Sequence, residues 1–210
     1  MPESPSNEFA VLRVVAVKGR APAAAVAVAE CLGLSVEEVD QRFTDLVDRG
    51  LAKSTPGGLR VVGPGRERVA ELVAAESAQV DRAAVAALYE RFCELNDELK
   101  EIVTAWQLTD ADTPNDHTDE AYDAAVVARL SALHDRARPV VAAVADLAPR
   151  LAPYSARLDS ADRRIAAGDH SYVTKPIIDS YHTVWFELHE DLIGLAGLTR
   201  ADEAAAGRGA

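Results

Sequence analysis

The amino-acid sequence predicts a mainly α-helical chain in which a small β-hairpin interrupts the helices near the N-terminus. Three observations lead to this fold class. The stretch "SVEEVD" begins a helix at Ser35, "STPGG" marks a tight hairpin turn, and no glycine or proline occurs between Arg66 and Trp106. Glycine and proline are the strongest interruptions of helices, so this long stretch without either predicts extended helical structure. We therefore expect an N-terminal unit of helices and a hairpin, followed by an antiparallel helical bundle.

The first third of the chain contains predicted helices on both sides of the hairpin. Apolar residues predict two helices that end at Gly19 and Gly33, because glycine commonly follows the last helical residue. Ser35 and Glu38 form an S-x-x-E capping box, which predicts the start of a third helix. Two short β-prone runs then flank the turn, and "GPGRERVAELVAAE" predicts a further helix. This order is that of a winged helix-turn-helix, which we expect in residues 9–76.

Two stretches of this region, "AVAECLGLSVEEVDQRFTDLVDRGLA" and "GGLRVVGPGRERVAELVAAE", allow a comparison with known families. They resemble bacterial winged helix-turn-helix transcriptional regulators of the MarR and PadR types. The resemblance implies that the helix of residues 36–49 enters the DNA major groove, and that the hairpin contacts the phosphate backbone or the minor groove. The side chains that this assignment brings to DNA are Ser35, Gln41, Arg42, Thr44, Lys53, Arg60 and Arg66.

The distribution of charge assigns any DNA contact to the first third. The chain has 210 residues and a net charge of −12, but residues 1–77 hold nine basic and eleven acidic residues, a net of −2. The remainder has a net charge of −10, and so acidic a surface repels phosphate. The predicted groove-facing helix presents one basic residue against five acidic ones. A second interpretation is therefore open, in which the winged helix is an adaptor that docks a protein partner.

The C-terminal two thirds predict an antiparallel helical bundle in residues 77–198 and a flexible tail in residues 199–210. Apolar residues recur at helical spacing through the second half of the long stretch without glycine or proline, and an acidic loop, "QLTDADTPNDHTDEA", follows it. A further helix continues past Pro139. We expect this bundle to form a homodimer.

The layout of a winged helix followed by a helical domain also resembles that of FadR-type regulators of the GntR group. In that group the helical domain binds a small effector, in some members through a metal held by one aspartate and three histidines. Asp123 and His134 are eleven residues apart, which is not the spacing of that family. The resemblance to FadR-type regulators therefore implies only the architecture of two domains. We expect neither a metal nor another cofactor.

Polar residues interrupt the apolar stripes of the predicted bundle, and a buried arginine or histidine needs a partner. One interpretation pairs Arg129 or the histidines with a carboxylate or with Asn96 across the bundle. The other is a pocket between helices that binds an anionic or aromatic metabolite. The residues that this pocket would use are Asn96, Trp106, Tyr122, Arg129, His134, Tyr181, His182, Trp185 and His189.

The last predicted helix, "IIDSYHTVWFELHEDLIGL", carries two of these histidines. At about 100° per residue, His182 and His189 lie together on the flank of an apolar arc, roughly 10 Å apart along the axis. That distance is too great for one metal ion without bending the helix. The same geometry predicts that Glu187 and Glu190 face outward and that Asp191 lies at the far edge of the arc.

Other classes of protein find little support in the sequence. It contains no G-x-S-x-G, P-loop or G-x-G-x-x-G motif, so we do not expect an enzyme. There is no apolar run long enough for a membrane span and no signal-peptide pattern, and the two cysteines are far apart, which together favour the cytoplasm. The sequence predicts a cytoplasmic DNA-binding regulator that senses a small molecule; a small-molecule-binding helical protein with a vestigial winged helix is the remaining alternative.

Overall fold

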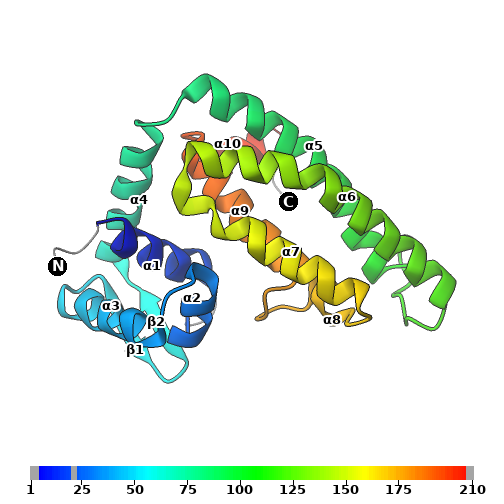
Figure 1. Cartoon of the computed structure of the whole chain (residues 1–210), viewed down its shortest axis with the longest axis horizontal. Coiled ribbons are helices and arrows are strands. Elements are labelled where there is room, and N and C mark those ends of the chain that lie inside the picture. Colours follow the sequence, from blue (N-terminus) through cyan, green and yellow to red (C-terminus); the bar gives the residue numbers. More distant parts are fainter. Residues whose placement is uncertain (1–4, 20–22, 207–210) are drawn as a thin grey trace. The chain divides into compact units, whose positions relative to one another are not determined.

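The computed structural model describes residues 5–19 and 23–206, and the chain divides into two compact units, residues 1–80 and residues 81–210 (Figure 1). The described residues are mainly helical and contain a small two-stranded antiparallel sheet in the first unit. The predicted fold class is confirmed at this level.

The first unit contains four helices and one hairpin in the described residues. Its elements are α1 (Pro5–Val17), α2 (Ala25–Leu32), α3 (Val36–Asp48), β1 (Ala52–Thr55), β2 (Gly58–Val61) and α4 (Gly63–Ser77). The capping box predicted at the start of α3 is present, because the Glu38 amide donates to Ser35 Oγ at 3.2 Å and the Ser35 amide donates to the Glu38 carboxylate at 2.9 Å. Apolar side chains of α1, α2, α3 and the hairpin, among them Leu12, Val28 and Leu46, form a common core.

The hairpin has a third backbone partner in the segment that precedes α2. Ala23 and Leu59 exchange two backbone hydrogen bonds, each 2.8 Å long. Gly58 makes this approach sterically acceptable, because a Cβ atom at that position would lie 2.2 Å from the Ala23 carbonyl oxygen. Gly58 also has φ 124°, which side chains rarely adopt. The hairpin is therefore fixed to the start of α2 through main-chain atoms.

The second unit is built from helices in its described part. They are α5 (Arg82–Gln107), α6 (Glu120–Leu147), the short 3-10 helix η1 (Pro149–Leu151), α7 (Pro153–Ala166), α8 (Ser171–Thr174), α9 (Tyr181–Leu195) and α10 (Arg200–Ala205). Helices α5 and α6 lie antiparallel as one long hairpin, and α9 contacts α5, α7 and α8 (Figure 1). Side-chain caps at Asp81, Asp119 and Ser180 begin α5, α6 and α9.

Helix α9 is the most enclosed element of the second unit, since ten of its fifteen residues are buried. The prediction that Glu187 faces outward is wrong, because Glu187 is only 4% exposed. Asp191, predicted at the far edge of the apolar arc, is only 2% exposed. The prediction assumed one apolar arc with solvent opposite it, whereas α7 packs against α9 and supplies charged partners there. Arg129, predicted inward, instead has a side chain that is 46% exposed and lies 3.7 Å from Glu101.

The buried carboxylates of α9 are matched by arginines. Arg157 in α7 donates from Nε and Nη2 to Asp179 at 2.7 and 3.0 Å, and from Nη2 to Glu187 at 2.6 Å. One turn further along α9, Asp191 accepts a 2.6 Å hydrogen bond from Tyr154 and lies 3.0 Å from Arg150. Every one of these ionised groups has an opposite charge at contact distance, which buried charges require.

The end of the described chain differs from the flexible tail expected for residues 199–210. Residues 200–205 form α10, which begins with a capping box between Thr199 and Asp202. Glu203 on this helix is fully buried, and Arg200 pairs with Glu190, which is half-buried rather than facing freely outward. Asp202, at the third helical position, completes the capping box by accepting a hydrogen bond from the Thr199 amide, which favours a helix in this segment. Residues 207–210 lie outside the described residues.

We expect Arg157→Ala to lower the free energy of unfolding by about 3 kcal/mol, because it removes the guanidinium that pairs with the buried Glu187 carboxylate and with Asp179. Urea unfolding followed by circular dichroism measures this change. The matched control is Arg163→Ala, an exposed arginine on the same helix, for which a change below about 0.5 kcal/mol is expected. Equal effects of the two substitutions would show that the buried ion pairs contribute no net stability.

Candidate functional site

The polar side chains in and before α3 that were predicted to read DNA bases all have nearby partners within the protein. Ser35 is occupied by the capping box. Gln41 donates to Asp45 at 3.2 Å, and Arg42 lies 3.9 Å from the same carboxylate. Thr44 donates to a carbonyl of the preceding turn at 3.0 Å. In this state, α3 presents exposed acids, and its Gln41, Arg42 and Thr44 side chains already have protein partners.

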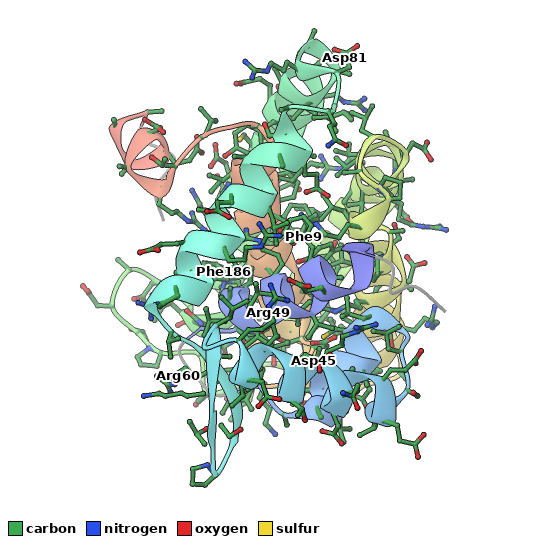
Figure 2. The ribbon with its side chains drawn as sticks, turned by 90° about the vertical axis from the view of Figure 1, so that its left-hand side faces the viewer. Phe9, Asp45, Arg49, Arg60, Asp81 and Phe186 are labelled. Atoms are coloured by element: carbon green, nitrogen blue, oxygen red, sulfur yellow. The ribbon has the colours of Figure 1, made fainter. Side chains whose placement is uncertain are left out.

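The basic residues of the hairpin are arranged differently. Lys53 and Arg60 are direct cross-strand partners, on the face of the hairpin opposite the buried side chains of Ala52 and Val61. Figure 2 shows the Arg60 side chain extending outward from β2. Within the described residues, neither of these side chains nor that of Arg66 forms an ion pair. Like charges directly opposite one another repel, so an anion at this face would relieve the repulsion.

The nine predicted ligand contacts do not form one pocket, and four of them lie together between α5 and α9. Asn96, His182, Trp185 and His189 line a cleft of about 190 Å³ there. The Trp185 indole donates to the Asn96 side-chain oxygen at 3.1 Å, and His189 Nε2 lies 3.2 Å from the Tyr89 hydroxyl. Asn96 and His189 therefore have protein partners in this cleft, although Trp185 and Tyr89 are not the partners that the interpretation of mutual pairing named.

Two further predicted residues, His134 and Tyr181, meet between α6 and α9. His134 Nδ1 lies 3.4 Å from the Tyr181 hydroxyl, and Nε2 lies 3.1 Å from a carboxylate oxygen of Asp159. Burial raises the pKa of Tyr181 above its ordinary value of 10.0. His134 and Asp159 also line a cleft of about 420 Å³ between α6 and α7. Both ring nitrogens of His134 already have protein partners.

Trp106, near the end of α5, and Tyr122, in the first turn of α6, lie at a third place, on either side of the loop that joins these helices. The Tyr122 hydroxyl lies 3.0 and 3.1 Å from the carbonyl oxygens of Ala105 and Leu108, to which it donates. The Asn115 side-chain amide donates to the Trp106 carbonyl at 3.2 Å. These bonds fix the end of α5 to the start of α6. The stretch predicted as a polar acidic loop is therefore a hydrogen-bonded structure.

This loop holds a histidine and an aspartate in contact. His117 Nδ1 lies 2.9 Å from Asp123 Oδ2, while the Asn115 amide donates to Asp123 Oδ1 at 2.8 Å. His117 has φ 60°, a conformation that non-glycine residues adopt uncommonly. Its ring lies 4.4 Å from the Trp106 ring, between centroids, and the His170 ring lies 5.5 Å from Trp106 on the same measure.

The electrostatics of this pair follow from its surroundings. Desolvation tends to raise the pKa of Asp123, but the hydrogen bonds from Asn115 and His117 outweigh it, so the pKa lies below its ordinary value of 3.8. Asp123 is consequently ionised at neutral pH. An ionised acceptor fixes the proton of the neutral imidazole on Nδ1, which leaves Nε2 of His117 as the nitrogen available to a ligand.

The His117–Asp123 pair opens onto the largest of the clefts described for this unit, with a volume of about 1010 Å³. Trp106, His117, Asp123, His170 and Lys175 line one part of it. The remaining lining comes mostly from small and apolar residues of α6 and α7. The cleft thus combines convergent polar groups with an apolar wall, the composition typical of small-molecule sites.

Sequence reasoning did not select His117, Asp123 or His170 as site residues, although it did select Trp106 beside them. One local signal was present. Asp119 caps α6, so Asp123 lies one turn into that helix, on the side from which the preceding loop approaches. A loop that ends in this way can return a side chain such as His117 to the first turn.

No family model, curated protein or solved structure matches this chain. Among the described residues, no helix has the length and apolar character needed to span a membrane. Within the same part of the chain, no group of three or more histidine, cysteine, aspartate or glutamate side chains is placed to hold a metal ion. The assignment of function therefore rests on the geometry of the two units.

We expect Asp123→Asn to destabilise the protein by about 1 kcal/mol at neutral pH, because it weakens two hydrogen bonds to a charged acceptor. The folded-state pKa of Asp123 is depressed, so its contribution is present above its ordinary value and is lost as the pH falls through the folded value. The difference in melting temperature between wild type and variant should therefore shrink below about pH 4.

The control for this measurement is Asp135→Asn, an exposed acid in the middle of the same helix, away from its first turn. This substitution removes one negative charge without removing a hydrogen bond to Asp123. The melting temperature of the variant should therefore match that of the wild type both at neutral pH and below about pH 4. A gap between wild type and Asp123→Asn that persists at low pH would contradict the assigned ionisation.

Proposed function

We propose that the chain is a cytoplasmic, dimeric DNA-binding transcription regulator, in which residues 9–76 are a winged helix-turn-helix and the helical unit dimerises and binds a small-molecule effector. The element order of the first unit supports this proposal. A three-residue turn from Gly33 to Ser35 joins α2 to the capped helix α3, and the hairpin follows directly. In proteins of this architecture, the capped helix enters the major groove and the hairpin lies beside it.

The observation that carries the proposal is the cross-strand pair of Lys53 and Arg60. Two like charges in direct opposition destabilise an isolated hairpin. Duplex DNA offers a negative charge about every 1.7 Å along its axis, so a phosphate beside this face would be attracted by both side chains. Arg66, in the first turn of α4, adds a third basic group beyond the end of the hairpin.

The acidic helix α3 determines what kind of DNA binding is expected. Its exposed acids, among them Glu37 and Asp40, repel phosphates, so the backbone contacts come from the hairpin. Gln41 and Arg42 reach bases only after they exchange their contacts with Asp45 for contacts with DNA. That exchange costs part of the binding energy, so the affinity is modest and falls steeply with salt.

One observation favours a second function, that of an adaptor for a basic protein partner. The polar side chains of α3 are satisfied internally, and its outward acids remain exposed. A surface of this kind attracts a positively charged protein. The DNA proposal is preferred because the basic residues of the hairpin, which form no ion pair with the part of the chain that the structure describes, have no role in such an adaptor.

We expect the protein to enrich a sequence motif from a randomised duplex pool at low salt, and Arg60→Ala and Lys53→Ala each to weaken binding. Each substitution should reduce the slope of log K against log salt by about 1, because one phosphate contact is lost. Fluorescence anisotropy over a salt series measures this slope. Arg163→Ala, an exposed arginine of the helical unit, should leave it unchanged. Absence of any enriched motif at low salt would refute the proposal.

Glu37→Gln distinguishes the two functions. This exposed acid lies in the first turn of α3, where residues of a groove-reading helix approach DNA. If the proposal is correct, removing its charge strengthens DNA binding in the same anisotropy assay, because repulsion of phosphate is reduced. An adaptor would show no DNA binding in either form and would bind a basic partner less tightly after the substitution.

A further inference from the structure

The cleft between α5 and α9 has a chemistry that the proposed function does not itself specify. We propose that it binds a small monocarboxylate built on a single six-membered ring, with the carboxylate held by Asn96 and Lys100 and the ring lying on Phe186. This inference rests on the proposed function, because it names the class of effector that the helical unit would sense. It is tested without DNA, so its failure and the failure of DNA binding are distinguishable.

The wall of the cleft contains a buried amide group with an unused donor. Asn96 lines the cleft and is only 6% exposed. Its side-chain oxygen accepts the 3.1 Å hydrogen bond from the Trp185 indole. An indole N–H can only donate, so this contact fixes which end of the Asn96 amide carries the NH₂ group. That NH₂ group has no partner in the part of the chain that the structure describes. A largely buried donor without an acceptor favours a ligand that brings one.

The charged residues that line this cleft are basic. Lys100 lies one turn after Asn96 on α5, and Arg200 belongs to α10. Among the described residues of the lining, none is an aspartate or a glutamate. Partial burial lowers the pKa of His182 below its ordinary value of 6.5, so this ring is neutral at pH 7. The positive charge of the lining therefore does not depend on a histidine.

Each of the two basic residues also has an acidic neighbour outside the lining. Lys100 Nζ lies 3.3 Å from Asp97 in a surface pair, which contributes little, and an ammonium group has two further donors. Arg200 donates from Nε to Glu190, while its Nη1 forms no hydrogen bond with the described residues. Counting both acids, the site is electrically neutral. Its preference for a carboxylate comes from donors that face the cleft without acceptors.

The large cleft beside His117 has a different balance of charge. Its lining includes the acids Glu120 and Asp123 and one lysine, Lys175. Two acids against one base disfavour an anion there. A carboxylate ligand is therefore expected in the smaller cleft between α5 and α9.

The apolar lining determines the body of the ligand. Phe186 is 46% exposed, and the Arg200 guanidinium carbon lies 5.2 Å from the centre of its ring. Leu99, Val103 and Trp185 complete the apolar lining. The cleft has a volume of about 190 Å³, and an apolar cavity of about 150 Å³ holds a benzene molecule. One six-membered ring with a carboxylate fits these dimensions, and a fused ring system does not.

The test uses the full-length protein and three probes of the same shape: benzoate, the neutral benzamide and the cationic benzamidine. Isothermal titration calorimetry at neutral pH measures the affinities. We expect saturable binding of benzoate, with benzamide weaker by about tenfold and benzamidine weaker still. In two-dimensional NMR, the side-chain amide signals of Asn96 should shift during the benzoate titration, because its NH₂ group acquires an acceptor.

Two variants assign the binding to this cleft. Asn96→Asp keeps an oxygen acceptor for the Trp185 indole but replaces the NH₂ donor by a second acceptor, and Lys100→Gln removes a charge at the surface. Each should weaken benzoate binding by about tenfold. Asn96→Asp should also remove the preference for benzoate over benzamidine. Lys175→Gln, which replaces an exposed lysine of the large cleft, is the matched control and should bind benzoate like the wild type.

Three results would overturn the proposal. They are the absence of saturable benzoate binding up to about 10 mM, binding of benzamide as tight as that of benzoate, and unchanged benzoate affinity in Lys100→Gln together with Asn96→Asp. Lys100 lies at the surface, so its variant remains informative if the change at Asn96 disturbs folding. Each of these results leaves the DNA-binding proposal untouched.

Discussion

The helical unit depends on the charge compensation that Arg157 provides. A guanidinium group that is almost fully covered contacts Asp179 and Glu187 at once, and so joins α7 to α9 and to the connection that precedes α9. Hydrophobic packing alone would hold these helices together without fixing their rotation, because it is not directional. A planar guanidinium bonded to two carboxylates accepts few geometries. The position of the segment from Lys175 to Asp179, and with it one wall of the large cleft, follows from this arrangement.

The two units use charge in opposite ways. In the helical unit, the carboxylates of Glu187 and Asp191 in α9 are paired with Arg157 of α7 and Arg150 of η1 at contact distance, and that arrangement stabilises one packing. On the hairpin, Lys53 and Arg60 lie opposite one another and form no ion pair within the described residues. Paired buried charges are expected where one packing must be specified. Like charges at a surface are expected where a charged partner must be attracted.

The sequence correctly predicted those elements whose position depends on one local signal. The capping box at Ser35 located the start of α3, and the "STPGG" turn located the hairpin, because both depend on residues within a few positions of each other. The burial of Glu187 and Asp191 could not be read in the same way, since an amphipathic pattern assumes one solvent face and α9 has neighbours on several sides. The spacing of Arg150, Tyr154 and Arg157 matches that of the two α9 acids, but this correspondence becomes visible only after α7 and α9 are paired.

The candidate cleft shows the same division. Trp106 and Tyr122 were recognised from the sequence because aromatic residues on helical stripes are conspicuous. His117 was missed, because a loop rich in aspartate, asparagine and threonine is normally read as solvated chain. Asp123 and His170 lie outside that loop, in α6 and before α8, and meet His117 and Trp106 only in the folded chain. In this protein the aspartate, asparagine and threonine side chains of the α5–α6 loop form short-range hydrogen bonds, and the bond from Asn115 to Asp123 connects the loop to α6. Which of them meet depends on backbone angles such as the φ of His117, and composition does not determine those angles.

The contact between Ala23 and Leu59 has a consequence for how the hairpin can evolve. Both hydrogen bonds are made by main-chain atoms, so they impose no requirement on the identity of the outward side chains nearby. Gly58 is sterically restricted by this approach, because a Cβ atom there would meet the Ala23 carbonyl oxygen. Exchanges at Lys53 or Arg60 therefore leave the hairpin anchored, and its outer face is free to diverge in specificity while the fold of the unit is inherited unchanged.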